Sequence, residues 1–224
     1  MRSACPYIDG ETEQRIAVDI SVNPHAHDGL ARAGFRRVEN WVYRPACPSC
    51  SACTPWRVDA TAFQPSRNMA RITARNRDLR REITGPDITD SHYPLFKSYV
   101  TDRHNDGQMA MMDQIDFISM IINSPVETVL VNYYDSDNRL VATALTDIQS
   151  DGLSAVYSFF NPQLAKRSLG SFIIIDLLAL AKDMGLRWVY LGYYVAASQK
   201  MMYKSRYQPA EIYQNGRWQP FTSA

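Results

Sequence analysis

The clearest alternation of hydrophobic and polar positions lies in the middle of the chain. Three runs rich in β-branched and aromatic residues, 126–134, 140–148 and 153–160, are separated by short polar segments at 136–138 and 150–152. Strand-forming runs joined by such short turns are typical of antiparallel hairpins. The pattern therefore predicts a three-stranded antiparallel meander.

Helical patterns flank this meander. We expect helices over 90–102, capped by residue 89 or 90, and over 113–122. After the meander, the polar segment 166–170 leads into residues 171–184, which are apolar on nearly all sides, as in a buried helix. A compact strand is expected over 187–193. Meander, glycine-containing loop, buried helix and strand follow one another in the GNAT acyltransferase fold, whose loop holds an anion on backbone amides at a helix N-terminus.

The ends of the chain give weaker signals. A short helix over 197–204 and a last strand over 206–213 complete the expected elements. Before Gly85-Pro86 the chain is rich in Pro, Cys and Arg and has little periodicity. We therefore predict a mixed α/β (α+β) fold with two domains, a smaller Cys- and Arg-rich domain over 1–85 and a GNAT-like catalytic domain over 86–224.

The net charge of +1 conceals opposite local charges. Residues 32–82 carry eleven Arg and no Lys against four acids and sum to +7, residues 83–165 sum to −8, and residues 166–224 sum to +5. Arginine offers a planar fork to phosphates and stacks on bases. The two basic blocks are compatible with a polyanionic partner, and solvated surface charge is the alternative reading.

Composition and hydropathy exclude several classes of protein. Hydrophobic residues make up 46% of the chain and charged residues 21%, which is ordinary for a globular protein. The N-terminus has no apolar signal region, and the longest apolar stretch, 172–181, is shorter than the ~20 residues of a membrane span. We therefore expect a cytoplasmic protein with no membrane partner.

Ten short motifs are spread along the chain from Cys5 to Lys204. They are Cys5-Pro-Tyr7, Gly34-Phe-Arg-Arg37, Tyr43-Arg-Pro45, Cys47-Pro-Ser-Cys50-Ser-Ala-Cys53, Arg75-Asn-Arg-Asp-Leu79, Asp102-Arg-His104, Tyr157-Ser-Phe-Phe160, Arg167-Ser-Leu-Gly170, Tyr190-Leu-Gly-Tyr193 and Lys200-Met-Met-Tyr-Lys204. Together they resemble the bacterial aspartate/glutamate leucyltransferases, which are relatives of the arginyl-tRNA–protein transferases.

This resemblance implies an enzyme of the N-degron pathway. It would move leucine from Leu-tRNA to the N-terminal Asp or Glu of a protein and so mark that protein for degradation. Two alternatives stay open: arginyl transfer from Arg-tRNA to the same acceptors, and a GNAT N-acetyltransferase that uses acetyl-CoA. A non-catalytic module that binds metal and RNA is a further alternative.

The implied reaction is aminolysis of an ester that is already activated, so no cofactor is required. An α-amine has a pKa of about 7.7–8.0 and is partly neutral in the cell. The enzyme must position the amine and stabilise the tetrahedral oxyanion. His104 is a candidate proton relay. Tyr157, Tyr193 and Tyr203 are candidates to donate to the ester carbonyl or to stack on the terminal adenine.

Two further groups follow from the resemblance. An acidic acceptor side chain calls for basic partners, and a tRNA 3′ end calls for an anion-binding loop. Each candidate has surface charge or ordinary packing as its alternative. The acceptor-binding candidates are Arg75, Arg77, Lys200, Lys204 and Arg206, and the candidates for the tRNA end are Arg167, Ser168, Leu169 and Gly170.

The cysteines form a separate motif. Cys47, Cys50 and Cys53 are spaced C-x-x-C-x-x-C, and Cys5 completes a set of four thiols. Such a set is a candidate tetrahedral site for zinc or for an iron–sulfur cluster, and the resemblance permits the latter. Packing of a small N-terminal domain is the alternative, and disulfides are not expected in a reducing compartment.

Overall fold

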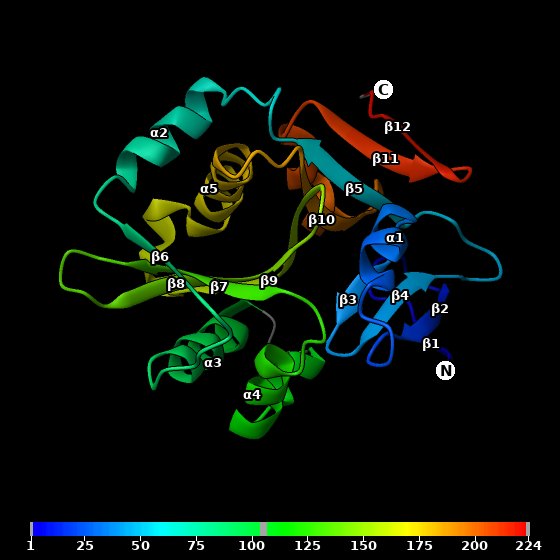
Figure 1. The fold of residues 1–224 in the computed structure, drawn as a ribbon, viewed down its shortest axis with the longest axis horizontal. Helices are drawn as coiled ribbons and strands as arrows, with labels where there is room; N and C mark the ends of the chain where they lie inside the picture. Colours follow the sequence, from blue (N-terminus) through cyan, green and yellow to red (C-terminus); the bar gives the residue numbers. More distant parts are fainter. Residues whose placement is uncertain (1, 104–106, 223–224) are drawn as a thin grey trace.

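The computed structural model describes residues 2–103 and 107–222 and contains two β-sheets (Figure 1). An eight-stranded sheet has the order β12-β11-β5-β10-β9-β8-β7-β6, and a four-stranded sheet has the order β1-β2-β4-β3. The mixed α/β class is confirmed. The elements are β1 (Arg2–Ala4), β2 (Thr12–Asp19), α1 (Ala26–Arg32), β3 (Arg36–Val38), β4 (Trp41–Pro45), β5 (Thr54–Asp59), α2 (Arg67–Arg75), β6 (Arg80–Thr84), α3 (His92–Arg103), η1 (Gln108–Met111), α4 (Gln114–Ile122), β7 (Thr128–Tyr134), β8 (Leu140–Ile148), β9 (Gly152–Phe160), η2 (Pro162–Arg167), α5 (Leu169–Asp183), β10 (Trp188–Tyr194), η3 (Gln199–Arg206), β11 (Ala210–Gln214) and β12 (Arg217–Pro220).

The predicted meander is confirmed as β7, β8 and β9, which pair antiparallel in chain order. Helix α5 then crosses over, and β10 returns parallel to β9, with Val189 opposite Leu153. The order expected of a GNAT-like acyltransferase is therefore present in the molecule.

Helices cover both faces of the large sheet (Figure 1). Apolar residues of α5, such as Ile173 and Leu177, join a buried cluster with Trp56 of β5 and Val131 of β7. On the other face, Phe96 of α3 belongs to a second buried cluster that includes residues of α4. The apolar character of segment 171–184 thus reflects burial on nearly every side, because the helix lies between the sheet and α2.

Two strands from the Cys- and Arg-rich half belong to the large sheet. β5 lies between β10 and β11, and β6 pairs with β7 at the edge. Strands from both sides of Gly85 therefore pair with one another, and the domain boundary at 85/86 stays a prediction about folding units.

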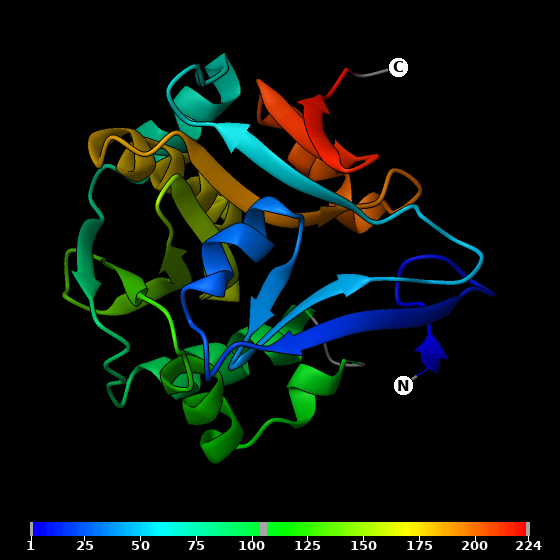
Figure 2. The same ribbon diagram turned by 45° about the vertical axis from the view of Figure 1, so that its right-hand side comes forward.

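The small sheet lies beside the large one (Figure 2), and a buried ion pair joins the two. Arg37 of β3 donates two hydrogen bonds of 2.8 and 2.6 Å to the carboxylate of Asp147 on β8, and both side chains are buried. A bidentate pair of this kind fixes direction as well as distance. It orients the N-terminal sheet on the acyltransferase-like core.

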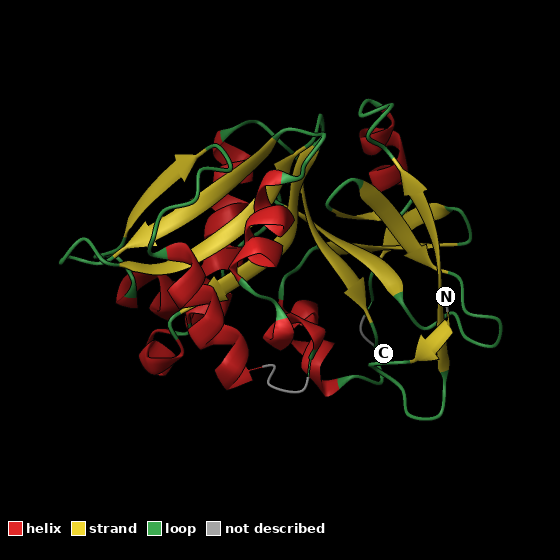
Figure 3. Ribbon diagram, turned by 90° about the horizontal axis from the view of Figure 1, so that it is seen from below, coloured by secondary structure: helices red, strands yellow, loops and turns green. Residues whose placement is uncertain are grey.

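The structure departs from expectation near the two ends of the chain. The helix expected over 197–204 is the 3₁₀ helix η3, and the last expected strand becomes a hairpin of β11 and β12. The small sheet was not predicted because β2 is mostly exposed and so lacks regular alternation. Figure 3 shows the strands in two groups, with most of the helices against the larger one. No helix within residues 2–103 and 107–222 combines the length and apolarity that a membrane span needs.

Candidate active site

Strands β9 and β10 pair only along their first three residues and then separate. Arg36 of β3 lies in the opening, where its guanidinium donates a hydrogen bond of 2.9 Å to the carbonyl oxygen of Val156. On the β10 side it lies against Gly192, where an added Cβ would come within 2.5 Å of that guanidinium. Gly192 also has a φ of +74°, so two independent reasons favour glycine at this position. The sequence motifs contained Arg36 without assigning it a role.

A cavity of about 900 Å³ opens beside this separation. Its walls come from α3, the end of β9, the first turns of α5, η3 and the segment after Cys5. It is large enough for a nucleotide-sized group together with a peptide end. Its polar lining includes Tyr7, Tyr99, Arg103, Ser158, Ser171, Lys200, Tyr203 and Lys204.

Lys204 is the most unusual of these side chains, because only 4% of it is exposed. Its ammonium donates a hydrogen bond to the carbonyl oxygen of Tyr193, and no ion pair to it occurs in the described part of the chain. Burial, together with the nearby Arg36, lowers the pKa of Lys204 to about 7. The cavity therefore contains a desolvated amine that can form an ion pair with a negatively charged ligand.

Two neighbours of Lys204 on η3 also line the cavity. Lys200 is exposed, and Tyr203 is 40% exposed, with its ring centroid 5.8 Å from the Lys204 ammonium. Desolvation raises the pKa of Tyr203 to about 12, so its hydroxyl stays protonated and can donate at neutral pH. Arg206 ends η3 with an exposed side chain that does not line this cavity.

The N-terminus of α5 supplies the opposite wall. Ser168 is the N-cap residue in a left-handed conformation, with φ 54°, and Gly170 and Ser171 line the cavity in the first turn. An added Cβ at Gly170 would lie 3.1 Å from the Phe160 ring, so glycine allows that ring to pack closely. The amides of Ser171 and Phe172 donate to the carbonyl oxygen of Ser168, both at 3.0 Å. The first two amides of the helix, those of Leu169 and Gly170, have no acceptor within it, which makes the turn suitable for an anion.

Two other residues predicted to hold the tRNA end have different surroundings. Leu169 is 2% exposed and belongs to the core. Arg167 forms a bidentate ion pair with Asp78, at 2.9 and 2.8 Å. Neither side chain lines the cavity.

Several of the described candidates also lie outside the cavity lining. Tyr193 is buried, and its hydroxyl donates to the carbonyl oxygen of Tyr43 at 2.8 Å, with that of Gly34 as an alternative acceptor at 3.2 Å, which ties β10 to the small sheet. Tyr157 packs against the buried cluster that contains Phe96, and its hydroxyl is buried without a partner in the part of the chain described. Arg75 and Arg77 belong to α2 and the turn after it, and His104 lies outside the described residues.

The structure thus gathers four sequence candidates, Gly170, Lys200, Tyr203 and Lys204, in one cavity. It adds Tyr7, Tyr99 and Arg103, which sequence reasoning did not assign. Tyr7 and Arg103 lie inside recognised motifs, so their motifs were the available signal. Tyr99 had none, because a tyrosine in a helical pattern is indistinguishable from an ordinary core residue.

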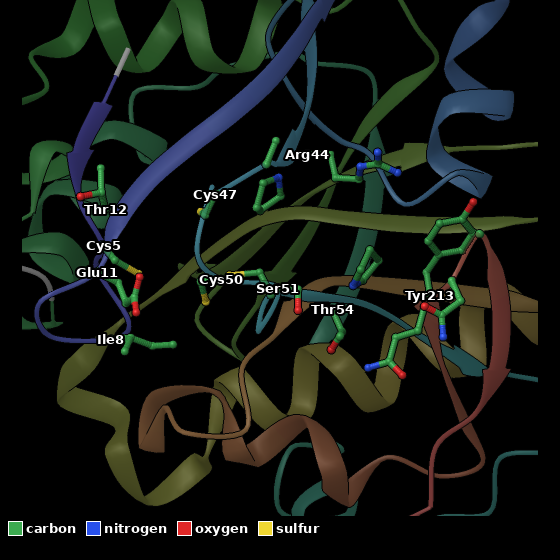
Figure 4. A pocket seen from close by; sticks show the side chains of 17 residues that line it. Cys5, Ile8, Glu11, Thr12, Arg44, Cys47, Cys50, Ser51, Thr54 and Tyr213 are labelled. Atoms are coloured by element: carbon green, nitrogen blue, oxygen red, sulfur yellow. The ribbon is translucent and has the colours of Figure 1, made fainter.

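The four cysteines share a second pocket of about 500 Å³ (Figure 4). Burial, with the neighbouring Cys5, Cys47 and Cys50, raises the pKa of the Cys53 thiol to about 11. All four are free thiols, and within the described ranges no three His, Cys, Asp or Glu side chains are arranged to hold a metal ion. The thiols are thus gathered, but their present arrangement does not fit a metal site. Zinc or an iron–sulfur cluster stays a prediction.

Comparisons with known proteins agree along most of the chain. Residues 3–71 match the family model described as the N terminus of arginine-tRNA-protein transferase, and residues 91–214 match the model of its C terminus. Aspartate/glutamate leucyltransferase of Cereibacter sphaeroides is 45% identical, covering 96% of this chain and 80% of that one. The proteins of the same name from Ruegeria pomeroyi and Paramagnetospirillum magneticum are both 44% identical, covering 97% of this chain and 81% and 90% of theirs. Among solved structures, L-PGS from Bacillus licheniformis has a TM-score of 0.49 at 12% identity, covering 64% of this chain and 46% of that one.

Proposed function

This chain belongs to the family of arginine-tRNA-protein transferases and aspartate/glutamate leucyltransferases, and we propose that it transfers leucine from Leu-tRNA to the N-terminal Asp or Glu of proteins. The product would carry a new N-terminal leucine as an N-degron, and the reaction would take place in the cytoplasm. The observation that carries the proposal is the cavity that brings Lys204, Lys200 and Tyr203 opposite the first turn of α5.

The acidic acceptor side chain pairs with the basic end of this cavity. Lys204 is buried and has no carboxylate partner in the described chain, so an Asp or Glu side chain supplies the charge that it lacks. Lys200, which is exposed at the rim, adds a weaker attraction. An alanine at the acceptor N-terminus offers neither interaction.

The aminoacyl end of the tRNA lies against the first turn of α5 and Tyr203. Backbone amides at Gly170 hold a phosphate or ribose oxygen of the 3′ end. The Tyr203 hydroxyl, which stays protonated, donates to the ester carbonyl as its oxygen becomes negative. The acceptor's neutral α-amine attacks the carbonyl carbon and a C–N bond forms. The ester C–O bond then breaks, the nitrogen loses one proton and the ribose oxygen gains one, so the tRNA leaves with a free 3′-terminal hydroxyl.

An assay of two donors against three acceptors tests this function. Purified protein is incubated with labelled Leu-tRNA or Arg-tRNA and with peptides that begin with Asp, Glu or Ala. We expect label only from Leu-tRNA, and far more on the Asp and Glu peptides than on the Ala peptide, which should show only residual labelling. Label from Arg-tRNA would support the arginyl alternative, and no label from either donor would exclude both transferase readings. Acetyl-CoA in place of tRNA tests the N-acetyltransferase alternative in the same format.

A further inference from the structure

Helix α2 carries three arginines at intervals of four residues, Arg67, Arg71 and Arg75. Residues four apart lie on the same side of a helix, so the three form one stripe, which we call the arginine face. All three are exposed, whereas Met69 and Ile72 are buried in the core on another side of α2. The arginine face is therefore turned toward solvent.

The first two arginines of this stripe, Arg67 and Arg71, do not stabilise the helix, whereas Arg75 lies in its last turn, where a positive charge is favourable. Like charges four residues apart repel, and Arg67 lies at the positive end of the helix dipole. The first turn has no acidic residue, and in the described chain neither Arg67 nor Arg71 forms an ion pair. The nearby Asp78 is already paired with Arg167. An external polyanion would relieve the repulsion that the chain itself leaves uncompensated.

The arginine face is joined to the cavity. Arg75, its last member, donates a hydrogen bond to the carbonyl oxygen of Lys166, and Asn76 donates one of 2.8 Å to that of Arg167. These carbonyls belong to η2, which leads directly into the first turn of α5, where Gly170 lines the cavity. A basic path therefore runs from the cavity over η2 and about 12 Å along α2.

We infer that the arginine face of α2, with the exposed Lys166, binds backbone phosphates of the tRNA acceptor stem whose 3′ end enters the cavity. This inference rests on the proposed function. The contacts are to phosphates, so they position the tRNA without reading its sequence. Three arginines rather than lysines suit the role, because guanidinium groups form planar, bidentate contacts with phosphate.

The test compares two variants with the same change of charge. Arg71→Glu reverses one charge on the arginine face, and Arg217→Glu reverses one exposed charge on β12, at the far edge of the large sheet. The dissociation constant for uncharged tRNA is measured at several salt concentrations. We expect Arg71→Glu to weaken binding about tenfold and to reduce the log–log salt slope by about 1, and Arg217→Glu to change neither. The double variant Arg67→Glu/Arg71→Glu should reduce the slope by about 2.

A short donor separates binding of the stem from damage to the active site. Leucine esterified to a CCA trinucleotide has no stem, so the double variant should use it with wild-type kcat/KM. Equal tRNA binding by Arg71→Glu and Arg217→Glu would overturn the inference, as would an equal loss with the short donor. The proposed function is judged independently, because it depends on whether the wild-type protein transfers leucine at all.

Discussion

The basic residues of this protein occur in two contrasting settings. Lys204 is buried in the cavity, where desolvation lowers its pKa to about 7. The arginines of α2 and η2 are exposed or half-buried, and guanidinium groups keep their charge at any physiological pH. A permanent charge in water suits a polyanion that must be held along its length. A desolvated amine, whose charge depends on what is bound beside it, suits recognition of a single carboxylate.

The largest expected effect is at Lys204. Replacing it in Lys204→Met keeps the volume and removes the charge, so we expect kcat/KM for Asp- and Glu-peptides to fall at least 100-fold, or about 2.7 kcal/mol. The residual activity on an Ala-peptide should change little, since that acceptor has no carboxylate to pair. Steady-state assays with the three peptides measure this. A uniform loss on all three, in a variant with an unchanged melting temperature, would argue against acceptor recognition by Lys204.

The pH dependence of acceptor binding should follow the same group. The free enzyme loses the ammonium charge as pH rises through about 7, and the neutral amine cannot pair with a carboxylate. Binding of an Asp-peptide is therefore coupled to proton uptake, and its dissociation constant should rise roughly fivefold from pH 7 to pH 8. Calorimetry in buffers of different ionisation enthalpy measures both quantities.

Lys204→Arg is the matched control for that titration. Arginine stays charged throughout this range, so only the titration of the peptide itself remains. The pH dependence of peptide binding should therefore be flatter for this variant than for the wild type. Identical profiles for the two proteins would assign the titration to another group.

A smaller effect is expected at Lys200, which shares η3 with Lys204 but is exposed. Exposed ion pairs contribute little, so Lys200→Met should raise the KM for Asp-peptides about threefold and leave kcat unchanged. The comparison with Lys204→Met in the same assay isolates the contribution of burial. Equal losses at the two lysines would show that position in η3, rather than burial, determines the effect.

The smallest effect is expected for the ion pair between Arg167 and Asp78. The arginine lowers the pKa of the Asp78 carboxyl, but both side chains are partly exposed, so the pair is worth about 1 kcal/mol or less. Asp78→Asn should lower the free energy of unfolding by no more than that, as measured by urea denaturation. It also frees Arg167, so tRNA binding should tighten slightly. Weaker binding would mean that the pair positions η2 rather than merely neutralising it.

Much of the fold could be predicted because its elements carry strong local patterns. The meander consists of strand-forming runs separated by short polar turns, and the helix over 169–183 is a long apolar segment. The ends of these elements agree with expectation within two residues. The four-stranded sheet could not be predicted, since strands such as β2 are solvated on most positions and carry no regular alternation. The position of β5 between β10 and β11 could not be predicted either, because sequence order does not determine which strands become neighbours.

The candidate site was predicted in part, and the reason differs from residue to residue. Lys200, Tyr203 and Lys204 are close together in the chain, so one short 3₁₀ helix was enough to bring them to the same cavity. Tyr193 and Tyr203 look alike as sequence, yet one joins two sheets through its hydroxyl and the other lines the cavity. Arg75 was grouped with the acceptor-binding lysines, but it lies on the arginine face of α2.

The amino-acid sequence by itself determined the order of helices and strands in the core, the family resemblance and the presence of two basic blocks. These properties depend on local periodicity and on residue identity, which a linear chain contains. Only the tertiary structure decided which basic side chains are buried and which are solvated, because desolvation depends on neighbours that are distant in the chain. Lys204 and Arg71 are both single positive charges in the sequence. In the folded protein, burial gives Lys204 a pKa near neutrality, whereas Arg71 is exposed on the surface of α2.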